Sequence, residues 1–196
     1  MHWLDLIDLI YLPLTGLAWS LIGTSMPRKD WNILDMKSEG KRVLRMYDYL
    51  VGSSCISYGY VGDQLCLLYD SSAPPRSTIR ITIAFLILSA SFGIIAITMQ
   101  CALSIVRYEA LVVSCIVIAL TLIALISAMT AICILVFRDY NKYKTAESMA
   151  EILGITFHPR LGQCYILTSL GIAIYGLAIG IKTYALVYDR YYYSDY

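Results

Sequence analysis

Two cysteines in the first polar stretch are the residues of this sequence whose type and spacing best suit a defined chemistry. Cys55 and Cys66 lie in two runs of alternating apolar and polar residues, on either side of the turn-like segment 59–63. Such alternation, bounded by Gly and Asp, predicts a β-hairpin in which the two thiols could face each other. A structural disulfide is the favoured interpretation, and two free thiols are the alternative.

The placement of the other cysteines supports that preference. They all fall within long apolar runs: Cys101, Cys115, Cys133 and Cys164. A disulfide between the loop pair would require an oxidising compartment. On the chain-entropy model it would add roughly 2–3 kcal/mol of stability, which matters to a sheet too small to build much core.

The sequence contains no constellation that predicts catalysis. His2 and His158 are its only histidines, and neither has a partner at metal-ligand spacing. A glycine-rich phosphate loop and a Cys/His zinc pattern are also missing. The long apolar runs lack the ionisable residues that a transporter or proton pump normally needs. We therefore expect no enzyme, no metal and no cofactor, and we assign the function to the polar loops.

The composition predicts a membrane protein. Hydrophobic residues make up 59% of the chain and charged residues 15%, with a mean hydropathy of +0.66, whereas a soluble domain is about 25% charged. Four uncharged runs stand out, each near the roughly 20 residues that a helix needs to cross a bilayer. We therefore expect an antiparallel four-helix transmembrane bundle with spans at about 6–26, 81–106, 110–137 and 162–188.

Two local features refine this bundle. The N-terminus lacks the basic segment of a signal peptide and carries Asp5 and Asp8 instead, so we interpret it as a retained span. Small residues recur in the last span at Gly171, Gly176 and Gly180, where they could let helices approach closely.

Two polar loops, 27–80 and 138–161, should carry the rest of the structure. Within the first loop, Trp31–Met36 is a strand candidate, and Arg42–Tyr49 could be a strand or a short helix. Together with the cysteine hairpin, these segments predict a small antiparallel β-sheet outside the bundle. The second loop has a helix-compatible part at Ala146–Leu153, and its chain breaks at His158-Pro159. A short tail, 189–196, ends the sequence.

Two arguments about topology disagree. The side with the large loops holds twelve basic residues (Arg28, Lys29, Lys37, Lys41, Arg42, Arg45, Arg76, Arg80, Arg138, Lys142, Lys144 and Arg160), and the other side holds three (Arg107, Lys182 and Arg190). The positive-inside rule would place the large loops in the cytoplasm. A loop disulfide would place them on the oxidising side instead. The net charge of +1 predicts neither a nucleic-acid partner nor another polyanion.

The layout of four spans, a long first loop with a cysteine pair, a short middle turn and a smaller second loop resembles the claudin family. The wider group includes peripheral-myelin-type proteins and the γ subunits of channels and receptors. The matching segments are Pro27-Arg-Lys-Asp-Trp31, the pair Cys55 and Cys66, Tyr69-Asp70, Arg80, and Arg160-Leu161-Gly162-Gln163.

The sequence also departs from the family pattern. Where claudins carry a Gly-Leu-Trp triplet, this chain has Tyr49-Leu50-Val51 or Leu50-Val51-Gly52, and no tryptophan stands just before Cys55. Asp139-Tyr140-Asn141 in the second loop lacks the proline that follows it in the family. The chain is therefore similar to a divergent member of this group.

The resemblance implies outward loops, cytoplasmic termini and a role at cell–cell junctions of the plasma membrane. The function expected from it is a paracellular barrier or ion pore, formed by self-association of the loops within one membrane and between two. An auxiliary γ-type subunit of a channel or receptor is the alternative. Besides lipid, a PDZ scaffold at the C-terminal segment 193–196 is a weaker candidate partner.

The resemblance also suggests roles for individual residues, each beside a simpler alternative. Trp31 could pack the sheet onto the bundle or anchor at the membrane interface. Arg80 could pair with a loop carboxylate or cap the sheet, or be an ordinary interfacial arginine. Asp63 and Gln64 lie where the family lines its pore, and a solvated turn carboxylate is the favoured alternative for Asp63. Gly162 belongs to the segment that enters the last span.

Overall fold

The computed structural model describes residues 3–28, 30–48, 53–59, 63–64, 66, 76–106, 111–152 and 155–193. The chain divides into two units, and each is described by itself. A helical unit comprises residues 1–23, 85–130 and 168–196, and a sheet unit comprises residues 24–84 and 131–167. That the whole chain acts as a single domain stays a prediction.

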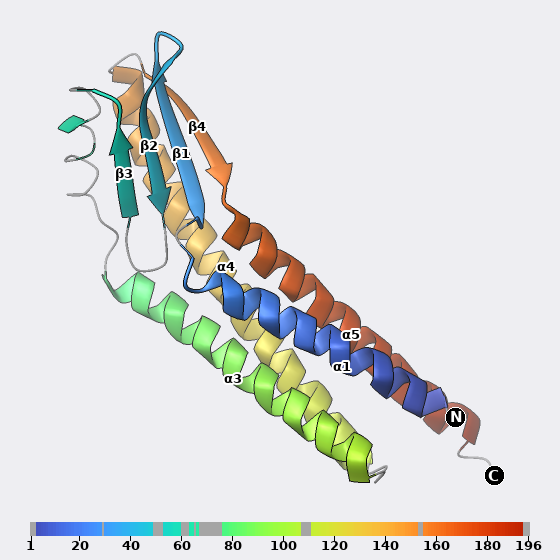
Figure 1. Ribbon diagram of the computed structural model, residues 1–196. Helices are drawn as coiled ribbons and strands as arrows, with labels where there is room; N and C mark the ends of the chain where they lie inside the picture. Colours follow the sequence, from blue (N-terminus) through green and yellow to red (C-terminus); the bar gives the residue numbers. More distant parts are fainter. Residues whose placement is uncertain are drawn as a thin grey trace. The chain divides into compact units, whose positions relative to one another are not determined.

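Four helices carry most of the chain: α1 (Trp3–Ser25), α3 (Arg76–Val106), α4 (Leu111–Ile152) and α5 (Gln163–Tyr193) (Figure 1). Three of them contain segments long and apolar enough to cross a membrane, at Ser77–Ser104, Leu111–Asn141 and Gln163–Tyr188. These segments confirm three of the expected spans and a multi-pass membrane protein. In α1 the apolar segment is only Leu9–Ser25, so the fourth span is not confirmed.

The helical unit packs around small residues and buried aromatic side chains. Trp19 of α1 donates a hydrogen bond from Nε1 to the carbonyl of Ala90, 2.9 Å away. At Gly171 an added Cβ would lie 2.9 Å from Ile22 Cγ1, so a larger residue there would force a neighbour to move. At Gly176 and Gly180 it would meet no atom within 4 Å. Of the three glycines predicted for helix contact, Gly171 alone serves it within this unit.

A buried lysine corrects one expectation about the spans. Lys182 lies just beyond the last uncharged run of the sequence, but the apolar segment of α5 continues past it to Tyr188. Its side chain is 5% exposed. Nζ donates to Gln100 Oε1 at 3.0 Å and lies 5.3 Å from the centre of the Tyr11 ring. The hydroxyls of Tyr11 and Thr121 are 2.6 Å apart. The spans therefore do hold an ionisable group, solvated by polar side chains of neighbouring helices.

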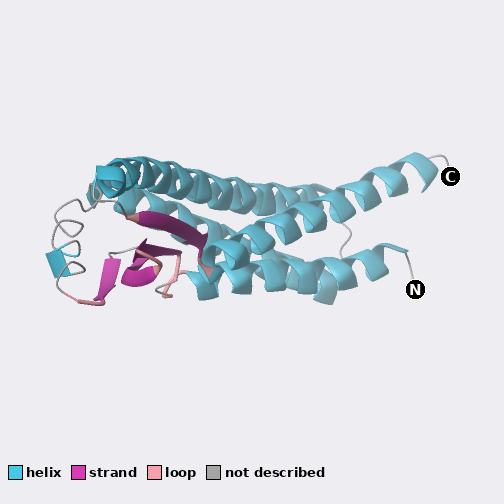
Figure 2. Cartoon of the chain, turned by 90° about the horizontal axis from the view of Figure 1, so that it is seen from above, coloured by secondary structure: helices cyan, strands magenta, loops and turns pink. Residues whose placement is uncertain are grey.

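The sheet unit contains four antiparallel strands in the order β3-β2-β1-β4 (Figure 2, strands in magenta). Their bounds are β1 Asn32–Ser38, β2 Lys41–Asp48, β3 Ser53–Ser57 and β4 Thr156–Leu161. The β1–β2 hairpin turns at Glu39 and Gly40, whose φ angles of 51° and 78° are those of the tight turn that best suits twisted strands. The predicted strand at Trp31–Met36 is confirmed as β1, and the open choice at Arg42–Tyr49 is settled as strand β2.

The predicted cysteine hairpin is wrong at the positions that the structure describes. Ser53–Ser57 pairs with β2, and Asp63, Gln64 and Cys66 are helical rather than extended. Because Ser53–Ser57 already has β2 as its partner strand, it does not require a second strand around Cys66. Residues 49–52, 60–62, 65 and 67–75 lie outside the described residues, and so do Tyr69-Asp70 and the triplet before Cys55.

The second polar loop agrees with its prediction only in part. The helix-compatible segment at Ala146–Leu153 is confirmed as far as Ile152, where α4 ends. The expected break at His158-Pro159 instead forms β4, an edge strand paired with β1. An edge strand tolerates Pro159 because its missing N–H can face away from the ladder. In this pairing Asn32 lies opposite Leu161. The two strands are far apart along the chain, so the local sequence patterns do not show that they are partners.

The two faces of the sheet differ in chemistry. One face is apolar: Leu34, Met36, Leu44 and Met46 form a buried cluster with Ile155, against which Cys66 and Tyr143 pack. Tyr143 is a residue of α4, and one end of this helix passes behind the strands in Figure 1. The opposite face carries Asp35, Arg45 and His158, which the strand register places side by side. We call these the inner and the outer face.

Candidate interaction site: the disulfide-bonded sheet

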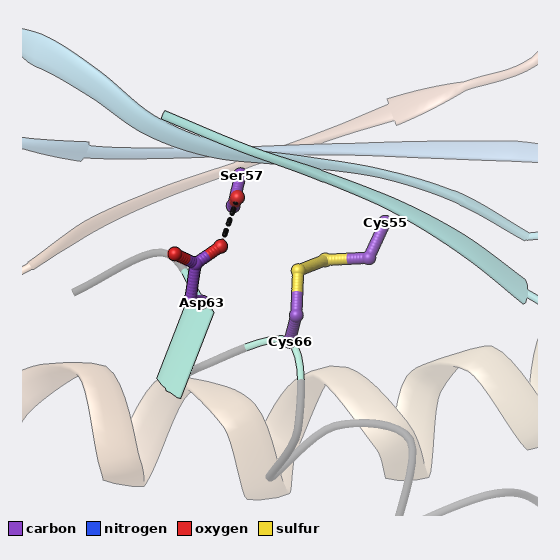
Figure 3. Close-up of a disulfide and its surroundings, with 4 residues drawn as sticks. All are labelled: Cys55, Ser57, Asp63 and Cys66. Atoms are coloured by element: carbon purple, nitrogen blue, oxygen red, sulfur yellow. Dashed lines mark hydrogen bonds between the residues drawn. A yellow bond between two sulfur atoms is a disulfide. The ribbon is translucent and has the colours of Figure 1, made fainter. Parts of the chain in front are cut away.

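A disulfide joins Cys55 to Cys66. Cys55 lies opposite the buried Met46 in the strand register, so its side chain is on the inner face. Figure 3 shows Cys55 and Ser57 leaving β3 on the same side, toward Cys66 and Asp63. Since Cys66 also packs on the apolar cluster, the bond fixes its helical turn beneath the edge of the sheet. The sequence therefore predicted the correct cysteine pair, whereas the strand that it predicted around Cys66 is wrong.

Removing this bond gives a direct test of its contribution. We expect the Cys55→Ser/Cys66→Ser variant to lose roughly 2–3 kcal/mol of unfolding free energy, because its unfolded chain is no longer cross-linked. Thermal unfolding in detergent measures this loss. Cys115→Ser is the control, because Cys115 is a free, exposed cysteine on α4. A reductant should lower the unfolding temperature of the wild type and leave that of the double variant unchanged; equal effects on both would refute the assignment.

Asp63 and Gln64 are exposed beside the disulfide. The Asp63 carboxylate accepts a hydrogen bond from Ser57 Oγ, and its backbone N–H donates to the carbonyl of Gly59 at 3.1 Å. An aspartate that closes a turn typically makes such hydrogen bonds with its side chain and its backbone. A role for the two side chains in lining an ion path stays a prediction.

Trp31 and Gly162 connect the sheet to the first turn of α5. The Trp31 ring is fully buried and meets the Tyr165 ring edge-on, with centroids 5.8 Å apart. The Gly162 N–H donates to the carbonyl of Trp31 at 3.0 Å. There is no room for a side chain at Gly162, because the backbone carbonyl of Asp30 occupies that position.

Asp139 is the polar centre of the same region. Its carboxylate accepts hydrogen bonds from Asn32 Nδ2, from Arg138 Nε at 2.8 Å, and from the Tyr165 hydroxyl at 3.3 Å. Both Asp139 and Asn32 are at least 97% buried. Strand β1 is thereby joined to α4 and α5. Asp139 was not predicted as a site residue. The signal in the sequence is an Arg-Asp pair, Arg138-Asp139, that directly ends a long apolar run.

On the outer face, Asp35 forms a bidentate ion pair with Arg45. Its carboxylate receives Arg45 Nε at 2.7 Å and Nη2 at 3.0 Å, and Arg42 Nε lies 3.3 Å away. Asp35 is 1% exposed. The hydrogen bonds from Arg45 hold the pKa of Asp35 below its ordinary value of 3.8, and the charges of Arg42 and Arg160 lower it further.

This shift predicts an acid-sensitive sheet. A carboxyl group whose pKa is lower in the folded than in the unfolded state stabilises the fold above its unfolded pKa, and this stabilisation is lost as the pH falls through the folded value. We therefore expect unfolding free energy to fall below about pH 4. Asp35→Asn should remove most of this acid dependence and lower stability at pH 7. Glu147→Gln, an exposed carboxylate on α4, should keep the wild-type profile, as judged by thermal unfolding from pH 7 to 2.

Arg80 is exposed on α3 and forms no ion pair with the described residues. Among all the residues that the structure describes, no group of three or more His, Cys, Asp and Glu side chains could hold a metal ion. No protein-family model matches the sequence, and no curated protein matches it. The likeness to claudins therefore stays a hypothesis that rests on layout and on the quoted segments.

Proposed function

We propose that this protein is a claudin-like junction protein whose sheet associates with other copies in the same and in the opposing membrane. The observation that carries the proposal is a disulfide-bonded, four-stranded sheet whose outer strands, β3 and β4, pair with no further strand among the described residues, in a chain that also holds long apolar helices. Unpaired strand edges offer backbone groups for association with another chain. The paracellular space between the membranes would then be sealed or made selectively permeable.

Exposed apolar side chains lie at both edges. At the β3 edge, Ile56 is 46% exposed and Tyr58, directly after the strand, is 49% exposed. At the β4 edge, Leu161 is 69% exposed. Apolar side chains in such positions favour association with another protein surface. They supply apolar contacts next to the charged side chains of the sheet.

The proposed topology places the sheet outside the cell and both termini in the cytoplasm. A disulfide forms and persists on the oxidising side of the membrane, which supports this orientation against the count of basic residues. That count is inflated by basic residues that pair with acids within the sheet, as Arg42 and Arg45 do with Asp35.

Expression in fibroblasts without junctional strands tests the proposal. We expect the protein to be enriched where two expressing cells meet and not at borders with non-expressing neighbours, which serve as the internal control. Ile56→Lys should reduce this enrichment while surface expression is maintained, because a lysine at an edge opposes strand addition. A uniform distribution, together with co-purification of one large membrane partner, would replace the proposal by the auxiliary-subunit hypothesis.

A further inference from the structure

The outer face of the sheet gathers basic side chains from three neighbouring strands. Lys37 of β1 pairs with Arg42 of β2, and Arg45 lies on the same face opposite Asp35. On the other side of β1, Arg160 of β4 pairs with Ile33, at a position of the same parity as Asp35. Adjacent strands lie about 4.8 Å apart. The four cations therefore form a continuous band across β2, β1 and β4.

The band carries a strong local charge. Asp35 is the one carboxylate that the described strands place on this face, so Lys37, Arg42, Arg45 and Arg160 leave a net charge of 4 − 1 = +3. The chain as a whole has a net charge of only +1, and that value alone predicts no polyanion partner. Folding separates the charges and concentrates the positive ones on one surface.

The side chains of the band are available to a partner. Arg160 is exposed, Lys37 is half-buried, and the Arg42 and Arg45 side chains are 38% and 25% exposed. Arg42 and Arg45 both pair with Asp35, which leaves Lys37 and Arg160 as the cations most available to an external anion. The inner face, by contrast, is filled by its apolar cluster and by Tyr143 of α4.

We propose that the outer face of the sheet binds a sulfated polysaccharide, a linear polyanion of the cell surface. Sulfate groups offer oxygen acceptors for the charge-assisted hydrogen bonds that Arg and Lys make. A linear polyanion can follow a band that crosses three strands. An anionic membrane surface fits less well, because the disulfide requires the oxidising side whereas anionic lipids concentrate in the cytoplasmic leaflet. The inference does not depend on the junctional function.

The test uses the full-length protein in nanodiscs of neutral lipid and a sulfated heparin oligosaccharide as the probe. Binding should weaken as salt rises, because counterions are released from the polyanion. In the Lys37→Gln/Arg160→Gln variant we expect about tenfold weaker binding and a log–log salt slope lower by about 1 to 2. The matched control, Arg28→Gln/Lys144→Gln, removes two charges from exposed positions outside the four strands and should bind as the wild type does.

Three outcomes would overturn this inference. An equal loss of binding in both double variants would show non-specific electrostatics and overturn it. Equal affinity for desulfated heparin, or stronger binding to vesicles containing anionic lipid than to heparin, would do the same. Both double variants must unfold at the wild-type temperature; if the face variant does not, Arg160→Gln alone replaces it. Enrichment at cell contacts is measured separately, so failure here leaves the proposed function intact.

Discussion

Replacement of Gly162 by alanine is expected to destabilise the sheet unit by about 4 kcal/mol or more, in the range that few single substitutions reach. The new Cβ would overlap the carbonyl oxygen of Asp30 and lie 2.6 Å from the carbonyl oxygen of Trp31. These atoms belong to the backbone, so no rotation of a side chain can relieve the overlap. They are also held in place, because the amides of Gly162 and Cys164 donate hydrogen bonds to them at 3.0 and 3.4 Å.

Relief of the overlap would require the Asp30–Trp31 backbone to move away from α5. The Trp31 ring would then leave its edge-on contact with Tyr165, and a fully buried side chain would lose its surroundings. Overpacking usually costs 1–3 kcal/mol where side chains can yield. The cost here is greater, since the clash and the loss of the buried tryptophan add.

Thermal unfolding in detergent, followed by tryptophan fluorescence, measures the effect of Gly162→Ala. Gly176→Ala is the matched control, because a Cβ at Gly176 meets no atom within 4 Å and the position lies in a helix. It should leave stability unchanged or raise it by up to about 1 kcal/mol. Wild-type stability of Gly162→Ala would show that the chain does not pass this close to α5.

The sequence was most informative about the helices, for a physical reason. A long uncharged run is a property of one continuous segment, and the need to satisfy backbone hydrogen bonds in lipid leaves a helix as the solution. Three spans were therefore predictable. The ends of these helices were not predictable. Helix α4 continues to Ile152 and β4 begins at Thr156, and no change in composition distinguishes these polar segments from a loop.

The sheet was only partly predictable, because alternation identifies a strand but not its partner. Strand β1 was found from its own pattern, whereas β4 is recognisable only once β1 is known to pair with it. The cysteine pair shows the same limit. Cys55 and Cys66 were paired correctly, although Cys66 belongs to a helical turn beneath β3 rather than to a neighbouring strand. A covalent pair constrains distance and leaves the local conformation open.

The polar contacts of the site were the least predictable part. Asp139 and Asn32 are separated by 107 residues, and nothing in either local sequence indicates their contact. Lys182 was likewise counted with the basic residues on one side of the membrane, because the sequence shows a charge but not the polar side chains of Gln100 and Tyr11 that surround it. Buried polar groups need such partners, and only the folded chain identifies them.

Removal of the Asp139 carboxylate is the second substitution expected to have a large effect. We expect Asp139→Ala to cost about 3–5 kcal/mol, because it breaks a buried ion pair and leaves one charge without its partner. That charge is Arg138, whose side chain is only 8% exposed. Asn32 Nδ2 and the Tyr165 hydroxyl lose an acceptor at the same time, and both groups are buried.

Two further variants separate the ion pair from the individual hydrogen bonds. Tyr165→Phe removes one 3.3 Å hydrogen bond and keeps the aromatic ring beside Trp31, so it should cost only about 1 kcal/mol. Asn32→Ala and Asp139→Ala, combined in a double-mutant cycle, should show a coupling of about 0.5–3 kcal/mol. If Asp139→Ala costs no more than Tyr165→Phe, or if the cycle shows no coupling, Asp139 does not join β1 to the two helices. If both results are as expected, this carboxylate joins β1 to the parts of α4 and α5 that belong to the sheet unit.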